Sequence, residues 1–225
     1  MIEIDHFFVF TTIDAPVIDQ LVKIGLTEGS RNVHPGQGTA NRRIFFHNAM
    51  LEFLWLRDEA EARSPLIAPT RLWERSRYRA SGYSPFGLAF RLTEPAKTSP
   101  SKLPFETWSF RPPYLPDHLH IDVARNEAHP AEPMLFVIPF GGRPDAAPPE
   151  QRQPLDHALG LREITSLRLT LPAQEPTSSA WQTIERLGLV SSASGAEPLI
   201  EVWFDHSPQG QQIDLRPELP LVLHW

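Results

Sequence analysis

The apolar and polar positions near the N-terminus predict a strand, a helix and a hairpin. Residues 2–11 are apolar on both faces, as in a strand that is covered on both sides. A helical stripe of apolar residues follows over 17–24 and is stopped by a glycine. Two more strand-like runs, 43–47 and 50–56, are separated by an Asn-Ala pair and indicate a hairpin. Residues 2–58 therefore form a βαβββ-type unit.

The C-terminal part of the chain repeats this succession. A strand over 163–171 leads to a helix over 177–187, with Leu187 facing inward, and then to two short strands. Both copies place a glutamate in an apolar run, Glu52 in the first and Glu201 in the second. Because such units cannot bury their sheets alone, we expect the copies to pack together.

The segment between the two copies is rich in strands and has no clear helix of its own. Strand-like runs occupy 86–92, 105–110 and 134–140. A short helix over 70–81 precedes them, and a Gly- and Pro-rich linker, 141–154, follows them.

These patterns divide the chain into two regions. The first, 1–142, holds the unit at 2–58 and a partly degenerate, strand-rich unit at 84–140. The second, 143–225, is a βαβββ-like unit that we expect to pack on the same core.

Composition and charge exclude several classes of protein. The net charge is −6, whereas nucleic-acid binding requires a clustered basic surface. No apolar run approaches the roughly 20 residues that span a bilayer. Glu3 and Asp5 stand where a signal peptide carries basic residues, so we expect a cytoplasmic protein without nucleic-acid or membrane partners. The absence of cysteine leaves His, Asp and Glu to hold any metal ion.

Two polar residues lie within apolar strands. By alternation, His6 shares its strand face with four large apolar side chains, Ile2, Ile4, Phe8 and Phe10. Glu52 lies in an apolar run, where a carboxylate must be paired, protonated, hydrated or bound to a cation. Two explanations stay open for Glu52: an ion pair with Arg43 or Arg91 on a neighbouring strand, or a role in binding or catalysis.

Three stretches of the first unit resemble the vicinal oxygen chelate superfamily, and within it the glyoxalase-like domain group. They are the opening IDH at 4–6, the loop HPGQGTANRR at 34–43 and the strand MLEFLWL at 50–56. The resemblance implies an α+β fold in which tandem βαβββ-type units form a half-open barrel, here with an additional, partly degenerate unit. Chain order favours a barrel shared by the first and second units, and the repeat favours the first and third.

The same resemblance implies a metal site. Metal-dependent members carry a His on the first strand and a Glu on the last strand of each of two units, which makes His6 and Glu52 expected ligands. Glu201 matches the second glutamate and is expected as a third ligand or a catalytic base, but Ser166 stands where the second histidine belongs. The ion would be divalent, of the Fe, Mn, Ni, Co or Zn type.

Five further residues are candidates for binding a substrate. In the glycine-punctuated loop, His34, Asn41 and Arg43 are placed to orient a polar ligand, and Trp55 and Tyr114 to wall the cavity. The alternative is a structural loop packed by its own prolines and glycines. His118 and His120 are a further pair that share one face of an extended stretch.

Two functions from different classes follow from these observations. The first is a small-molecule enzyme of the lyase, isomerase or dioxygenase type, in which a divalent metal polarises two vicinal oxygens of the substrate. The second is a metal-free protein that binds or sequesters a small molecule. The partners expected are therefore a small-molecule ligand and, in a homodimer, a second copy of the chain.

Overall fold

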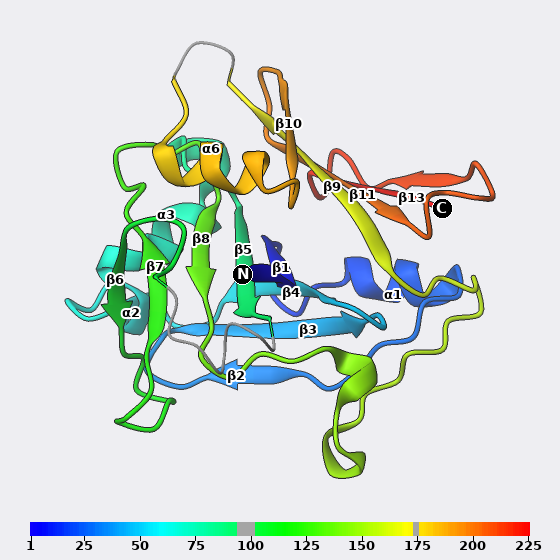
Figure 1. Ribbon diagram of the computed structural model, residues 1–225, viewed down its shortest axis with the longest axis horizontal. Coiled ribbons are helices and arrows are strands. Elements are labelled where there is room, and N and C mark those ends of the chain that lie inside the picture. Colours follow the sequence, from blue (N-terminus) through cyan, green and yellow to red (C-terminus); the bar gives the residue numbers. More distant parts are fainter. Residues whose placement is uncertain (94–101, 173–175) are drawn as a thin grey trace.

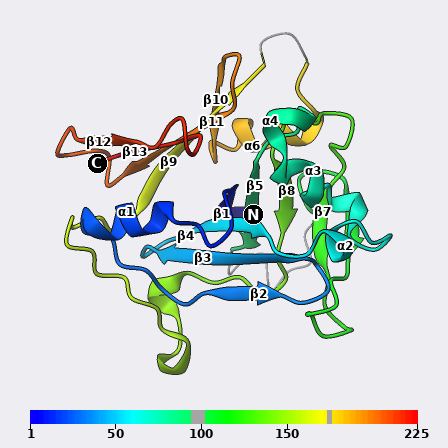
Figure 2. The same cartoon turned by 180° about the vertical axis from the view of Figure 1, so that it is seen from behind.

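The structure is a computed structural model that describes residues 1–93, 102–172 and 176–225, and its strands form two sheets (Figures 1 and 2). The larger sheet has eight strands in the order β2-β3-β4-β1-β5-β8-β7-β6. Their bounds are β1 (Ile2–Phe10), β2 (Asn32–His34), β3 (Thr39–Phe45), β4 (Met50–Leu56), β5 (Phe86–Leu92), β6 (Thr107–Phe110), β7 (Ile121–Ala124) and β8 (Met134–Val137).

The larger sheet consists of two halves that meet between β1 and β5. These two strands pair antiparallel, and each then pairs in parallel with the last strand of its own half, β4 or β8. The first and second units thus share this sheet, as chain order indicates, and the third unit does not contribute a strand to it. The sheet is open, because its edge strands β2 and β6 are not paired with each other in the described part of the chain.

The smaller sheet belongs to the C-terminal region and lies across one side of the larger one (Figure 1). Its order is β10-β9-β11-β13-β12, with β9 (Ile164–Leu171), β10 (Ser191–Ser194), β11 (Leu199–Phe204), β12 (Gln212–Asp214) and β13 (Leu221–His224). The side chain of Ser178 caps helix α6 (Ser179–Arg186), because its Oγ accepts a hydrogen bond from the backbone N–H of Trp181. Leu187 is 46% exposed, so its expected inward position is wrong: the helix ends before it.

The remaining helices are short. They are α1 (Val17–Lys23), α2 (Glu59–Ala62), α3 (Leu72–Ser76) and α4 (Tyr78–Ser81), with 3-10 turns η1 (Ala68–Thr70), η2 (Pro144–Ala146) and η3 (Pro149–Gln151). The helix predicted over 70–81 is broken at Arg77, whose backbone leaves the helical region. None of the helices in the described residues has the length and hydropathy needed to span a bilayer.

The two faces of the larger sheet pack in different ways. One face, with Phe7, Leu51 and Leu88, shares a large apolar core with the smaller sheet and with helices α1 and α6. The opposite face carries a separate apolar cluster that includes Phe8 and Phe136. The apolar core on the first face holds the three units together. The second face forms the wall of a cavity.

A bulge in β1 changes the face to which its first residues belong. The pairing of β1 with β5 shifts register between Ile4 and His6, so that Asp5 is the extra residue. His6 and Phe8 lie on the cavity face, but Ile4 packs against the shared core. The expectation that His6 shares its face with Ile2 and Ile4 is therefore wrong, because strict alternation fails at the bulge.

Candidate functional site

The free face of the larger sheet lines a cavity of about 750 Å³. This volume lies within the usual range for sites that bind small molecules. Strands β1, β3 and β4 contribute to one side of the cavity, and β6, β7 and β8 to the other. Residues of the predicted linker, 141–154, also form part of its wall, together with Phe140.

The two halves of the sheet give the cavity a polar side and an apolar side. Arg43 and Glu52 are direct cross-strand partners on β3 and β4, and the same row continues through Phe8 to Gly87 and Met134. Along this row, β3 and β4 of the first half supply the charged side chains of Arg43 and Glu52, whereas β8 of the second half supplies the apolar side chain of Met134. Gly87 is required here, because a Cβ at this position would lie 2.1 Å from Cε1 of Phe8.

Glu52 is at the centre of the polar side and is only 5% exposed. Its Oε1 accepts a hydrogen bond from Nδ2 of Asn41, and its Oε2 lies 3.7 Å from Nε2 of His6. Neither Arg43 nor Arg91 forms an ion pair with Glu52 in the described part of the chain, so the ion-pair explanation for this residue is not supported.

His6 is held by its chain neighbour. Its Nδ1 lies 2.7 Å from Oδ1 of Asp5, which the bulge turns towards the same face. Burial opposes protonation of His6, but the hydrogen bond to Asp5 and the charges of Asp5 and Glu52 outweigh it and raise the His6 pKa. Sequence reasoning missed Asp5, because neighbouring residues in a regular strand point to opposite faces.

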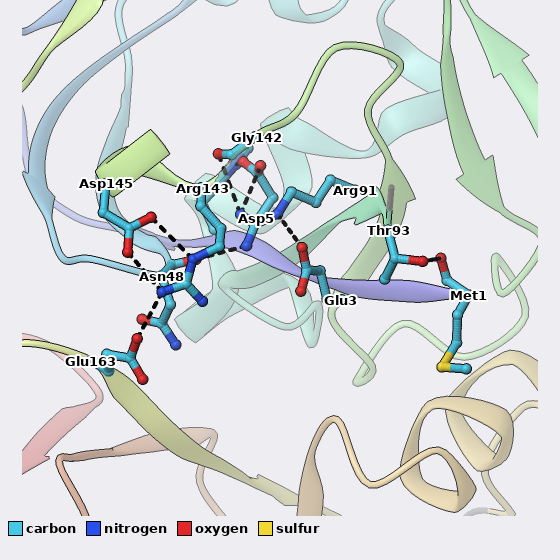
Figure 3. A network of polar contacts seen from close by, with 11 residues as sticks. Met1, Glu3, Asp5, Asn48, Arg91, Thr93, Gly142, Arg143, Asp145 and Glu163 are labelled. Carbon is cyan, nitrogen blue, oxygen red and sulfur yellow. Dashed lines mark hydrogen bonds and ion pairs between the residues drawn. The ribbon is translucent and has the colours of Figure 1, made fainter. Parts of the chain in front are cut away.

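Arg91 anchors Asp5 from the other side, within a network that reaches both sheets (Figure 3). Its guanidinium donates to Oε1 of Glu3, 2.8 Å away, to Oδ2 of Asp5 at 3.2 Å and to the carbonyl of Asn48 at 2.9 Å. A weaker contact reaches the carbonyl of Gly142 in the cavity wall. The side chain of Asn48 in turn bonds to the backbone of Ile164 on β9.

At the cavity, the loop from His34 to Asn41 contacts Tyr114 of the proline-rich stretch. The hydroxyl of Tyr114 donates to Oε1 of Gln37, 3.1 Å away, and its ring lies 5.1 Å from that of His34. Gly36 has a φ of +76°, and a Cβ there would meet Cγ of Pro113 at 2.7 Å. His34, Asn41, Arg43 and Tyr114 all line the cavity, together with Gln37, which sequence reasoning did not include.

Three other expected groups lie elsewhere. Trp55 faces the shared core, since it alternates with Glu52 along β4. Glu201 lies in the smaller sheet, where it pairs with Arg168 at 2.7 Å and with His224 at 3.3 Å. The third group is the loop pair His118 and His120, neither of which lines the cavity.

The cavity residues do not form the metal-ligand set that the resemblance implies. Within residues 1–93, 102–172 and 176–225, no three His, Asp or Glu side chains are grouped to hold one ion. His6 and Glu52 would be two ligands, whereas catalytic sites of this kind usually have three. The described residues therefore do not fit a resident Fe, Mn, Ni, Co or Zn ion.

Comparison with known proteins agrees with the fold. Residues 4–185 match the family model described as a glyoxalase-like domain. This match covers most of the chain, so the protein belongs to that family, which is part of the vicinal oxygen chelate superfamily. The resemblance noted in the first unit and the expected α+β fold are confirmed.

A solved structure shows that the whole architecture occurs elsewhere. The chain is similar to a crystal structure of a hypothetical protein from Staphylococcus aureus, with a TM-score of 0.58 and 9% identity, over 100% of this chain and 99% of the other. At this identity the likeness concerns the fold alone. No curated protein matches the sequence.

Proposed function

We propose that the protein is a small-molecule enzyme of the lyase or isomerase type, in which His6 and Glu52 transfer protons without a resident metal. The observation that carries the proposal is the Asp5–His6 hydrogen bond beside Glu52, at the polar side of an otherwise apolar cavity. A carboxylate that orients an imidazole is a recurrent arrangement in acid–base catalysis. Membership of the glyoxalase-like family supports a small molecule as the substrate.

The geometry suggests a role for each group. Asp5 holds the proton on Nδ1 of His6, so that Nε2 is the atom that exchanges a proton with the substrate. The raised pKa favours the protonated form of His6 and suits it to be the acid. Glu52 is then the base. It takes a proton from a carbon next to a carbonyl, and His6 protonates the carbonyl oxygen to give an enol. Glu52 then returns its proton to the same carbon or, in the enediol of an α-hydroxyketone, to the other carbon, while the hydroxyl that becomes the carbonyl gives its proton back to His6.

A second candidate is a metal-free protein that binds and sequesters the same kind of molecule. The favouring observation is the apolar side of the cavity, where Phe8, Phe110 and Phe136 offer aromatic walls. The contact between Tyr114 and Gln37 closes part of the rim over them. Such a protein would need the cavity but not the proton-transfer pair.

Hydrogen exchange tests the enzyme directly. Chelator-treated protein is incubated in D₂O with a panel of aryl and alkyl 2-oxo acids and α-hydroxyketones, and exchange next to the carbonyl is followed by NMR. We expect catalysed exchange that falls at least about 100-fold in His6→Ala and in Glu52→Gln. The matched control is Arg31→Met, whose side chain is 61% exposed and lies outside the cavity.

Each outcome decides between the candidates. Equal exchange rates in wild type and His6→Ala would overturn the role of His6. Binding of panel members without exchange would replace the enzyme by the sequestering protein. Stoichiometric divalent metal in untreated protein, lost in the His6→Ala/Glu52→Gln double variant, would overturn the metal-free mechanism.

A further inference from the structure

We infer that the ligand of this cavity is a carboxylic acid with an aromatic or branched apolar body, and that Arg43 binds its carboxylate. The inference rests on the proposed function of the cavity and adds the chemical class of the molecule. It is drawn from the charges that line the polar side and from the position of the apolar wall.

Arg43 differs from the other two arginines that line the cavity. Arg91 has Glu3 and Asp5 as partners, and Arg143 has Asp145 and Glu163. No carboxylate lies within ion-pair distance of Arg43 among the residues that the structure describes. Its charge is therefore left for a ligand to neutralise.

The guanidinium of Arg43 is fixed in position. Its Nε donates to the carbonyl of Ser30 at 2.8 Å, its Nη2 donates to the hydroxyl of Ser30 at 2.5 Å, and the group lies over the ring of Phe45. These bonds leave Nη1 as a donor without a hydrogen-bond partner in the described part of the chain. Arg43 is half-buried, and burial lowers its pKa, so an anion in the cavity would stabilise its charged form. A preoriented guanidinium suits a carboxylate.

The apolar wall defines the rest of the molecule. Across the cavity from the polar side lie five apolar side chains of the second half-sheet and its extension, Phe110, Ile121, Met134, Phe136 and Ile138. The ring of His6 makes an edge contact with Phe136, with centroids 5.7 Å apart. A ligand with its carboxylate at Arg43 thus extends past His6 onto aromatic and aliphatic groups, which exclude water from its body.

The cross-strand pairing of Arg43 with Glu52 also explains why the cavity suits a ligand with one anionic group and not a ligand with two. Direct cross-strand partners have Cβ atoms about 5 Å apart. A carboxylate on Arg43 therefore places the neighbouring carbons of the ligand near Glu52 and His6. A dianion would bring its second charge beside the carboxyl group of Glu52, the cross-strand partner of Arg43.

Paired probes test this class of ligand. Binding is measured calorimetrically at low salt for arylalkyl 2-oxo acids, each beside its neutral methyl ketone, and for pyruvate, which lacks the apolar body. We expect the aryl acids to bind at least about tenfold more tightly than either comparison, as a charge-assisted bond predicts. Arg43→Met should abolish the preference for the acid, Arg43→Lys should retain part of it, and Arg31→Met should leave it unchanged.

The outcomes separate this inference from the proposed chemistry. Acid binding that depends on Arg43, without hydrogen exchange, would keep the ligand class and remove the enzyme. Exchange confined to neutral ketones would keep the enzyme and overturn the ligand class. Equal affinity of acid and ketone, an unchanged preference in folded Arg43→Met, or no binding by any probe would overturn the inference.

Discussion

Asp5 and His6 are neighbours in the chain, yet their side chains share one face of β1 and lie 2.7 Å apart. The bulge at Asp5 makes this contact, since in a regular strand the two side chains would point apart. Bulges often occur next to active sites, where they redirect a side chain. In this protein the bulge converts an isolated buried histidine into one that is oriented by a carboxylate.

Asp5→Asn should lower the pKa of His6. The amide keeps the shape of the carboxylate but removes the charge that favours protonated His6, so burial then dominates. The measurement is an NMR titration of the His6 ring. The exposed Asp117→Asn, on a distant loop, is the control and should leave the titration unchanged. A His6 pKa that stays raised in Asp5→Asn would contradict the assignment.

The same pair sets a pH dependence of stability. The folded-state pKa of His6 is raised, so its contribution is complete below its unfolded value of about 6.5 and is lost as pH rises through the folded value. The free energy gained from wild-type His6 relative to His6→Gln should therefore decrease as pH rises above neutrality. Urea unfolding at several pH values measures this difference, and an increase with pH would contradict it.

His157 should act with the opposite sign. Its Nδ1 accepts from the backbone N–H of Thr27 and its Nε2 contacts the carbonyl of Phe45, each at 3.0 Å, and burial lowers its pKa. A lowered histidine pKa means stability that is present above about pH 6.5 and lost as pH falls below it. Relative to His157→Gln, the wild type should lose unfolding free energy between pH 7.5 and pH 5. The measurement is urea unfolding of both proteins. An equal difference in unfolding free energy at the two pH values would contradict this prediction.

Removal of Arg91 should destabilise the fold strongly. Arg91 is 2% exposed, and Arg91→Met leaves the partly buried Asp5 without its arginine partner and the carbonyls of Asn48 and Gly142 without this donor. Breaking such a buried network costs about 3–5 kcal/mol. The control Arg31→Met breaks an exposed pair with Glu28 and should cost less than about 1 kcal/mol. Comparable losses in the two variants, measured by chemical denaturation, would show that the network is not coupled to folding.

Gly87→Ala should also destabilise the protein, because its Cβ would overlap the ring of Phe8. We expect a loss of about 1–3 kcal/mol as the ring moves into the cavity. Gly142→Ala is the matched control, since a Cβ there meets nothing within 4 Å. Thermal unfolding measures both variants. An unchanged unfolding temperature in Gly87→Ala would contradict this prediction, because it would mean that the ring of Phe8 moves aside without a loss of stability.

Local patterns in the sequence predicted much of the fold. The first helix, the hairpin of β3 and β4 and the strand β9 each depend on residues within a few positions of one another. Strand β7 was missed, because Ile121–Ala124 is short and follows a polar, proline-rich loop. The pairing of β1 with β5 joins residues that are 77 to 90 positions apart, and apolar runs alone do not indicate such partners.

The site was only partly predictable for the same reason. His6 and Glu52 stood out, because polar groups in apolar surroundings need partners, and Asn41 stood out as part of the glycine-punctuated loop. Asp5 did not stand out, since alternation assigned it to the other face. Glu201 was matched to Glu52 by its position in a repeated unit, but the repeat gives no information on which sheet a unit joins.

The stretch between the two sheets has a consequence for how the protein can be divided. Segment 140–153 connects the sheets and also lines the cavity, and it is fastened near one end through Gly142 and near the other through Gln153, which accepts from Ser30. A cut in this segment would leave His6 and Glu52 in place but open one side of the chamber to solvent. Exchange between relatives that is meant to keep the cavity must therefore carry this segment together with the first 140 residues, and the smaller sheet must remain to cover the other face of the larger one.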